Sequence, residues 1–245
     1  MKNLLLVFAH KRMLVVLLMG FASGIPLALT GSTLQAWMTT QGVNLSTIGL
    51  FALVGMPYAL KFLWAPLIDQ LIPPFLGRRR GWLILVQIPL VLSIAAMAFT
   101  NPAAQPIVVA LLGLMVSFFS ASQDIVVDAY RREILAEKEF GAGSGLYVMG
   151  YRVAMVVSGA FAFILADHMD WKHVYLIMAA VMSAGIATTI FADEPKSQGA
   201  PPRTLKDAVV LPFVDYFSRS GSIAMLIFMV LYKLDVAMTV AMTTP

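Results

Sequence analysis

The sequence contains no cysteine, which excludes disulfide bonds, thiolate metal sites and cysteine nucleophiles. It has only three histidines, and no two of them have the H-x-x-x-H spacing of a helical metal site. No nucleophile–base pair and no phosphate-binding glycine loop is visible, which argues against an enzyme. We therefore expect no catalytic residues, no metal and no cofactor.

Charge is also scarce, because Asp, Glu, Lys and Arg make up 12% of the chain, about half the share of an average soluble domain. Apolar residues make up 60% and lie in long blocks. Blocks of about twenty such residues are typical of transmembrane helices. The sequence thus predicts an all-α integral membrane protein, with six spans near residues 13–37, 48–68, 82–99, 106–127, 143–165 and 173–192.

The composition changes after the sixth span. Residues 1–192 form the predicted six-helix bundle, and residues 193–221 form a polar, proline-bearing linker. Thr204-Leu-Lys-Asp207 is a helix-opening pattern, so we expect a short amphipathic helix that Pro212 ends or bends. Residues 222–245 form a seventh apolar run, interpreted as the first helix of a truncated carboxy-terminal bundle.

The basic residues set the expected orientation. The sequence pI near 9.4 could suggest nucleic-acid binding, but the basic residues lie in short loops between apolar blocks. Thirteen of the 17 Lys and Arg fall at the amino end, in the loops near 69–81 and 129–141, or in the linker. The opposite loops carry only Lys172. This bias predicts a cytoplasmic amino terminus and linker, and no nucleic-acid partner.

Small residues and a proline interrupt the first span, at Gly20, Gly24, Pro26 and Gly31. An interrupted helix can free backbone groups to face a transport cavity. Small residues also allow helices to pack closely in lipid. Both interpretations stay open on the sequence alone.

The fourth span ends in a polar stretch with two carboxylates, Asp124 and Asp128, four residues apart on one helix face. A carboxylate inside a membrane rarely faces lipid. We take both as proton-coupling candidates. For Asp128 we favour an interfacial anchor paired with Arg131 or Arg132, whereas the deeper Asp124, preceded by Gln123, is interpreted as functional.

Several stretches together resemble a known transporter family. The loop from Asp69 to Gly77-Arg-Arg-Arg80 resembles the signature between helices 2 and 3 of the major facilitator superfamily, with Ala65 at its leading glycine position and a longer Asp-to-Gly spacing. More specific are Gly20-Phe-Ala-Ser-Gly-Ile-Pro-Leu-Ala-Leu-Thr-Gly-Ser-Thr-Leu-Gln-Ala-Trp-Met38, Lys61-Phe-Leu-Trp-Ala-Pro-Leu-Ile-Asp69 and Ser120-Ala-Ser-Gln-Asp-Ile-Val-Val-Asp-Ala129. These resemble AmpG-type muropeptide permeases.

The resemblance implies a major facilitator-type six-helix bundle plus a seventh segment, in a bacterial inner membrane. It implies proton-driven import of anhydromuropeptides (N-acetylglucosaminyl-anhydromuramyl peptides) for peptidoglycan recycling. The implied partners are muropeptide, protons and membrane lipid, with a missing carboxy-terminal half or a second copy needed for transport. Two alternatives remain: transport of another solute such as an acyl-coenzyme or sugar conjugate, and a non-transporting half-length membrane protein.

A muropeptide offers sugar faces, amides and carboxylates, which match aromatic rings, amide side chains and basic groups respectively. Each candidate has a structural alternative. Arg152 would bind a substrate carboxylate or pair with Asp124, Lys61 would bind substrate or extend to the interface, and Tyr147 and Tyr151 would stack a sugar or pack between helices. The substrate-binding candidates are Gln123, Arg152, Tyr147, Tyr151, Lys61 and Asp235.

Two further groups are assigned structural roles. The basic run Arg78 to Arg80 is expected to set topology and to brace helix ends. Trp37, Trp82 and Trp171 lie near the ends of predicted spans, where they are expected to be anchors at the membrane interface. In the seventh span, AmpG-type permeases usually have Lys-Leu-Gly-Asp. This chain has Lys233-Leu-Asp-Val236 instead, which weakens the assignment of Asp235.

Overall fold

The computed structural model describes residues 10–196 and 205–243, and all of its regular structure over these residues is helical. The chain divides into two compact units, Met1–Ala200 and Pro201–Pro245, which are described separately. The α-helices of the first unit are α2 (Lys11–Thr30), α3 (Ser32–Thr40), α4 (Leu45–Leu50), α5 (Met56–Leu60), α6 (Ala65–Gln70), α7 (Arg78–Met97), α8 (Pro106–Ile134), α9 (Phe140–Val156), α10 (Ala162–Ala166) and α11 (Trp171–Phe191). The second unit contains α12 (Leu205–Ser218) and α13 (Ser222–Thr243).

Six helical stretches of the first unit are long and apolar enough to cross a membrane. They are Lys11–Thr40, Leu45–Leu63, Arg78–Met97, Pro106–Ile134, Glu137–Ala166 and Trp171–Phe191. The predicted all-α membrane class is therefore confirmed. The second span is the least regular, because the 3₁₀ turns η1 (Phe51–Gly55) and η2 (Lys61–Leu63) interrupt it.

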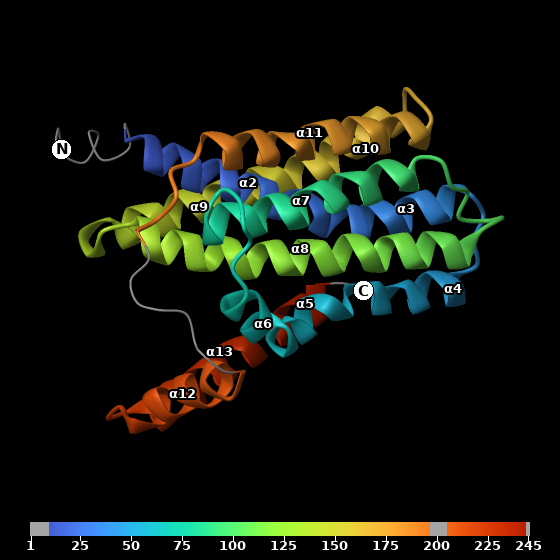
Figure 1. Cartoon of the computed structure of the whole chain (residues 1–245). Helices are drawn as coiled ribbons and strands as arrows, with labels where there is room; N and C mark the ends of the chain where they lie inside the picture. The colour runs from blue at the N-terminus through green and yellow to red at the C-terminus, as the bar shows by residue number, and fades with distance from the viewer. Residues whose placement is uncertain (1–9, 197–204, 244–245) are drawn as a thin grey trace, which may run out of the picture. The chain divides into compact units, whose positions relative to one another are not determined.

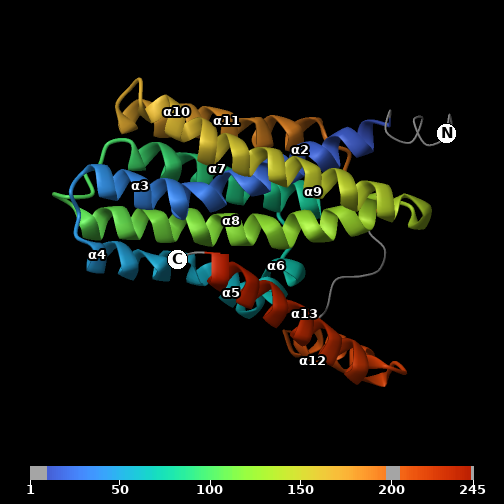
Figure 2. The same cartoon turned by 180° about the vertical axis from the view of Figure 1, so that it is seen from behind.

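The long helices lie side by side as a bundle with α2 at its centre (Figures 1 and 2). Helix α2 packs against α8, α9 and α11, and α7 packs between α8 and α11. The broken second span lies along one side of α8, with α5 against it. Most residues of α2 are buried, including many of its apolar residues and the small residues Gly20, Ala22, Ser23 and Gly24.

Glycines bring α2 and α9 into backbone contact. A Cβ atom added at Gly20 would lie 2.3 Å from the carbonyl oxygen of Tyr147, and one at Gly24 would lie 2.4 Å from that of Tyr151. On α9, a Cβ at Gly150 would lie 2.1 Å from the carbonyl oxygen of Leu17. Helix α2 is therefore not interrupted at Gly20 or Gly24. At these two positions the absence of a side chain allows α2 and α9 to pack closely.

The break in the first span comes at Gly31, between α2 and α3. The fifth span also departs from α-helical geometry, through the π-helical turn η4 (Val157–Phe161) between α9 and α10. The two irregular segments meet, since α2 and α3 both contact η4. The buried hydroxyl of Thr33 donates a hydrogen bond to the carbonyl oxygen of Ser158 at 2.6 Å, so a backbone acceptor in the π-turn is satisfied from the neighbouring span.

The tryptophans differ from the sequence prediction in one case. Trp37 is buried, and its ring lies 4.9 Å from that of Tyr175 and 6.2 Å from that of Trp171. It is thus a core residue of the bundle, because α11 covers the face that would otherwise meet the interface. Trp171 and Trp82 do place their indole N–H groups on polar partners, Thr40 Oγ1 and the Leu71 carbonyl oxygen.

Helix α8 is longer than the predicted fourth span, which was expected to stop near Val127, and it continues to Ile134. The added residues are charged and favour helix, and Asp128 pairs with Arg131 one turn on. Asp124 therefore lies ten residues, about 15 Å, from the end of its helix, and not close to it as the sequence suggested.

In the second unit, Pro212 lies inside α12, which runs on to Ser218. Of the two outcomes expected at Pro212, a helix end is wrong, because a proline removes one N–H donor while the apolar residues around it still favour helix. A bend of α12 at Pro212 stays a prediction. The chain turns later, at Gly221 with φ of 83°, and α12 and α13 are bent by 104° there. Thr204, the expected start of the helix, lies outside the described residues.

Candidate functional site

The site forms where the broken second span meets α8. Asp124 is mostly buried, and Oδ2 of its carboxylate lies 4.0 Å from Nζ of Lys61 in η2. Lys61 is more open, with 36% of its side chain exposed against 15% for Asp124. The 3₁₀ turn η2 packs against α8, so Lys61 reaches a carboxylate of that helix.

Gln123 and Ser23 connect this site with α2. The Gln123 amide nitrogen lies 3.4 Å from Ser23 Oγ, and both side chains are buried. Gln123 Oε1 and Asp124 Oδ1 have no hydrogen-bond partner within the described part of the chain. Two acceptor atoms are thus left unpaired beside the ion pair, although buried acceptors are normally satisfied.

Two aromatic rings from α9 lie beside this site. The Tyr147 and Tyr151 rings are 6.4 Å apart between centroids, as expected for residues on one helix face. The Arg131 guanidinium lies 4.5 Å from the centre of the Tyr147 ring. A cation in that position occupies one ring face. Tyr151 therefore offers the more open ring for stacking on a solute.

The interpretation of Asp128 as an anchor agrees with the geometry. Its carboxylate lies 3.2 Å from the Arg131 guanidinium, and 51% of its side chain is exposed. Because Arg131 also packs on Tyr147, the pair fixes this face of α8 near the helix end at Ile134. Asp128 remains a candidate for proton coupling only through its closeness in sequence to Asp124.

The structure assigns Asp124 a different partner from the one considered on sequence grounds. Among the described residues, Lys61 is the basic residue within ion-pair distance of Asp124, and Arg152 is not. Arg152 is exposed on α9, next to Tyr151. The structural alternative for Arg152 is therefore wrong, and its role as a carboxylate-binding residue stays a prediction.

Asp235 lies on α13 in the second unit, and its side chain is outside the described part of the structure. Its assignment as a substrate-binding residue therefore stays a prediction. Within residues 10–196 and 205–243, no three His, Asp or Glu side chains come together as metal ligands.

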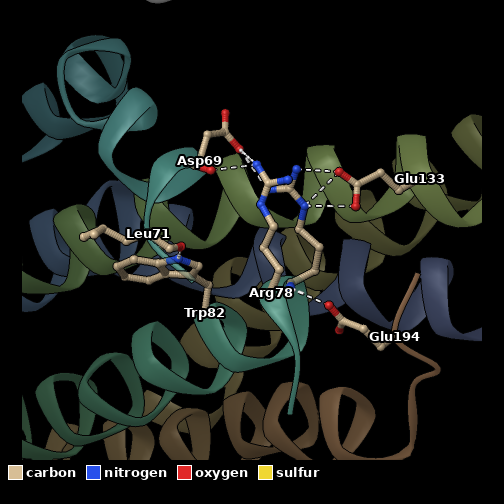
Figure 3. Close-up of polar contacts among 7 residues, drawn as sticks. Asp69, Leu71, Arg78, Trp82, Glu133 and Glu194 are labelled. Carbon is tan, nitrogen blue, oxygen red and sulfur yellow. Dashed lines mark hydrogen bonds and ion pairs between the residues drawn. The ribbon is translucent and has the colours of Figure 1, made fainter. Parts of the chain in front are cut away.

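A second polar cluster braces one end of the bundle around Arg78 and Arg79. Figure 3 labels Arg78, Asp69, Glu133 and Glu194 of this cluster. The Arg79 side chain is only 5% exposed, and its Nε lies 3.0 Å from Glu133 Oε1 on α8. Its Nη1 lies 2.9 Å from Asp69 Oδ1, and Arg78 Nη2 donates to the Asp69 carbonyl oxygen. This confirms the expected bracing role of the basic run.

Glu194, just after α11, completes this cluster. Its two carboxylate oxygens accept hydrogen bonds from the backbone N–H groups of Arg79 and Arg80, at 2.8 and 3.0 Å. These N–H groups belong to the first turn of α7, where a helix has unpaired donors and favours negative charge. Gly77, with φ of 86°, leaves room for the carboxylate, since a Cβ there would lie 2.5 Å from Glu194 Cδ.

Sequence reasoning missed Glu133, Glu194 and the Lys61–Asp124 pair. Glu133 was placed in a loop, but the extension of α8 carries it opposite Arg79. The sequence did contain one signal, the three consecutive arginines at 78–80. An arginine that becomes buried needs a carboxylate partner.

Comparison with known proteins decides the family. The family model of the Major Facilitator Superfamily matches residues 16–244. The chain belongs to the major facilitator superfamily. It is 48% identical to the anhydromuropeptide permease of Escherichia coli K12 over 239 aligned residues, and this alignment covers 97% of the chain.

Two further relatives show the same pattern. A protein of Haemophilus influenzae is 40% identical over 228 residues, which is 91% of this chain and 54% of that protein. A putative transporter named AmpG 1 of Rickettsia bellii is 34% identical over 172 residues, or 69% of this chain and 42% of that protein. The chain spans about half the length of the curated relatives it matches, including 49% of the Escherichia coli permease.

Proposed function

We propose that this chain supplies the amino-terminal bundle of a proton-coupled importer of anhydromuropeptides that serves peptidoglycan recycling. The observation that carries the proposal is its 48% identity, over 97% of the chain, to a protein named as an anhydromuropeptide permease. In the major facilitator superfamily, two six-helix bundles alternate around a site between them. The activity therefore belongs to a protein with both bundles.

Proton coupling would use Asp124. The carboxylate is mostly buried in a membrane-spanning helix, where its charge is favourable only while a partner or water compensates it. Lys61, at 4.0 Å and partly exposed, is a partner that can move away. Release of Lys61 toward a substrate carboxylate would favour proton uptake by Asp124, so substrate and proton would bind together.

Substrate binding would use groups around that pair. The unpaired oxygen of Gln123 can accept a hydrogen bond from a peptide amide or a sugar hydroxyl. The open ring of Tyr151 can stack on a sugar, with Tyr147 beside it. Arg152, exposed next to Tyr151, can bind a peptide carboxylate. Replacement of Gln123 by Ala should thus weaken binding more than coupling.

The proposed location is a bacterial inner membrane, with a cytoplasmic amino terminus. The count of thirteen basic residues on one side against one on the other supports this orientation. Because the chain has no cysteine, single cysteines can be placed without background. In intact cells, an impermeant thiol reagent should label a cysteine at Ser46 and leave one at Ser220 unlabelled. The opposite pattern would overturn the orientation.

The test of the proposed substrate uses this chain fused to the carboxy-terminal half of the Escherichia coli relative. Membrane vesicles with an imposed proton gradient should accumulate labelled anhydromuropeptide. Unlabelled anhydromuropeptide should compete, whereas an acyl-coenzyme should not. Accumulation of the acyl-coenzyme or of another sugar conjugate in its place would support the alternative solute. A well-inserted fusion that transports none of them would contradict the proposal.

A further inference from the structure

Five buried polar atoms lie along one side of α8 and on the facing helix α5. None of them has a hydrogen-bond partner among the residues that the structure describes. They are Tyr58 Oη, Ser117 Oγ, Ser120 Oγ, Gln123 Oε1 and Asp124 Oδ1. Buried polar atoms almost always have a partner from protein or ordered water. Their grouping therefore indicates a ligand of this face that carries both donors and acceptors.

The spacing of these residues makes a continuous line. Ser117, Ser120 and Asp124 follow one another at three and four residues, so they share a face of α8. From Asp124 to Ser117 the line extends about 10 Å toward Pro106, where α8 begins. Ser117 and Ser120 are fully buried, which excludes bulk solvent as their partner.

Tyr58 closes the line from the opposite side. Its hydroxyl lies beside those of Ser120 and Thr30, and near the Asp124 carboxylate. The Thr30 hydroxyl already donates to the Pro26 carbonyl oxygen at 3.0 Å, so toward Tyr58 it can only accept. Tyr58 can therefore donate to Thr30 or Ser120. Among the described residues, the groups left without a partner on this face are the Ser117 hydroxyl and the acceptor atoms Gln123 Oε1 and Asp124 Oδ1.

Water matches this set of groups. It can donate and accept, and buried water makes about three hydrogen bonds to otherwise unpaired groups. The 4.0 Å separation of Lys61 and Asp124 is also longer than a direct hydrogen bond, and such gaps are commonly bridged by water. The oxygen nearest Lys61 is Asp124 Oδ2, and the other oxygen, Oδ1, has no partner among the described residues and is available to the line of hydroxyls.

We propose that this face of α8 binds ordered water, held by Tyr58, Ser120 and Ser117, which links Asp124 to the half of the bundle where α8 begins. Tyr58 is a positioning residue for this water. The site itself follows from the unpaired atoms. Its use as a proton path rests on the proposed function. The nearest water gives a proton to Asp124 and receives one from the next hydroxyl or water in the line. After the last transfer every water and hydroxyl has its original number of protons, and one proton has moved along the line to Asp124.

The water site can be tested on the purified chain without any solute. X-ray radiolysis of bound water produces hydroxyl radicals in place, and these modify adjacent side chains, as mass spectrometry can quantify. Tyr216 is the matched control, because it is partly exposed like Tyr58 and its hydroxyl donates to the Ser222 carbonyl oxygen at 2.9 Å. Tyr58 should be modified several-fold faster than Tyr216. Equal and slow modification of both tyrosines would overturn the water site, whatever the transport assay shows.

The proton path is tested separately in the fusion with the Escherichia coli half. Tyr58→Phe and Ser120→Ala should each slow substrate-driven proton uptake several-fold, with solute binding retained. Ser93→Ala is the control, because buried Ser93 donates only to Pro89 in its own helix, at 2.7 Å. Proton uptake by Tyr58→Phe at the rate of the unmodified fusion would refute the path.

Discussion

Arg79 is an almost fully buried guanidinium that binds carboxylates on two other elements, Asp69 and Glu133. Truncation to Ala would leave both carboxylates without this partner and the bundle end open. Losing one partner of a buried ion pair costs about 3–5 kcal/mol. We expect Arg79→Ala to lower the thermal unfolding temperature of the detergent-purified chain strongly, as followed by tryptophan fluorescence.

Two variants sharpen this residue-scale test. Arg79→Lys keeps the charge but loses the planar fork that binds Glu133 through two nitrogens, so its loss should be intermediate. Arg219→Ala removes an exposed pair with Asp215 in α12, and exposed pairs contribute little. Equal unfolding temperatures for Arg79→Ala and Arg219→Ala would contradict the bracing role.

The i,i+3 pair of Asp128 and Arg131 was predictable from spacing, because both lie on one regular helix. The Lys61–Asp124 pair was not, because the second span changes between α and 3₁₀ geometry from residue 51 to residue 63. A change in residues per turn shifts the direction of every later side chain. Regular periodicity therefore could not show that Lys61 points toward α8.

At the scale of helices, the contact between α2 and α9 depends on glycine. Gly20→Ala would place a Cβ atom 2.3 Å from the Tyr147 carbonyl oxygen, so the helices must separate. Gly145 on α9 is the matched control, since a Cβ there meets nothing within 4 Å. In a helix, Ala is favoured over Gly by about 1 kcal/mol. Gly145→Ala should thus be neutral or stabilising, and Gly20→Ala should lower the unfolding temperature.

The outcome for Gly20 also bears on the site. Tyr147 and Tyr151 lie on the part of α9 that this contact fixes, so Gly20→Ala should weaken solute binding in the fusion even where the protein still inserts. Unchanged stability and binding in Gly20→Ala would show that α2 and α9 can accommodate the added methyl group, which would contradict the close contact.

The existence of the six spans was predictable, because each is a block of apolar residues long enough to cross a membrane. The ends of the helices were less predictable from the sequence. The charges after Val127 resembled a loop but extend α8, and Pro212 resembled a helix end but lies inside α12. In both cases the neighbouring residues favour helix strongly enough for the helix to continue past the charged residues or the proline. A sequence pattern does not show the relative strength of these two preferences.

At the scale of the whole molecule, the chain provides one bundle of the kind that major facilitator transporters pair with a second. Glu133 and Glu139 are mostly buried carboxylates paired across spans near the ends of their helices, whereas Asp124 lies further inside α8 with Lys61 as its partner. The proposed coupling therefore depends on a single side chain at the middle of α8. Asp128, exposed and paired with Arg131, is the natural comparison.

The most direct test of this account is substrate-induced proton uptake by the fusion in proteoliposomes, with solute binding measured in parallel. Asp124→Asn keeps the shape of the side chain but cannot bind and release a proton. We expect it to abolish proton uptake and accumulation while retaining solute binding, and we expect Asp128→Asn to have a much smaller effect. If Asp124→Asn still moved protons with solute at the wild-type ratio, Asp124 would be structural and the coupling site would lie elsewhere.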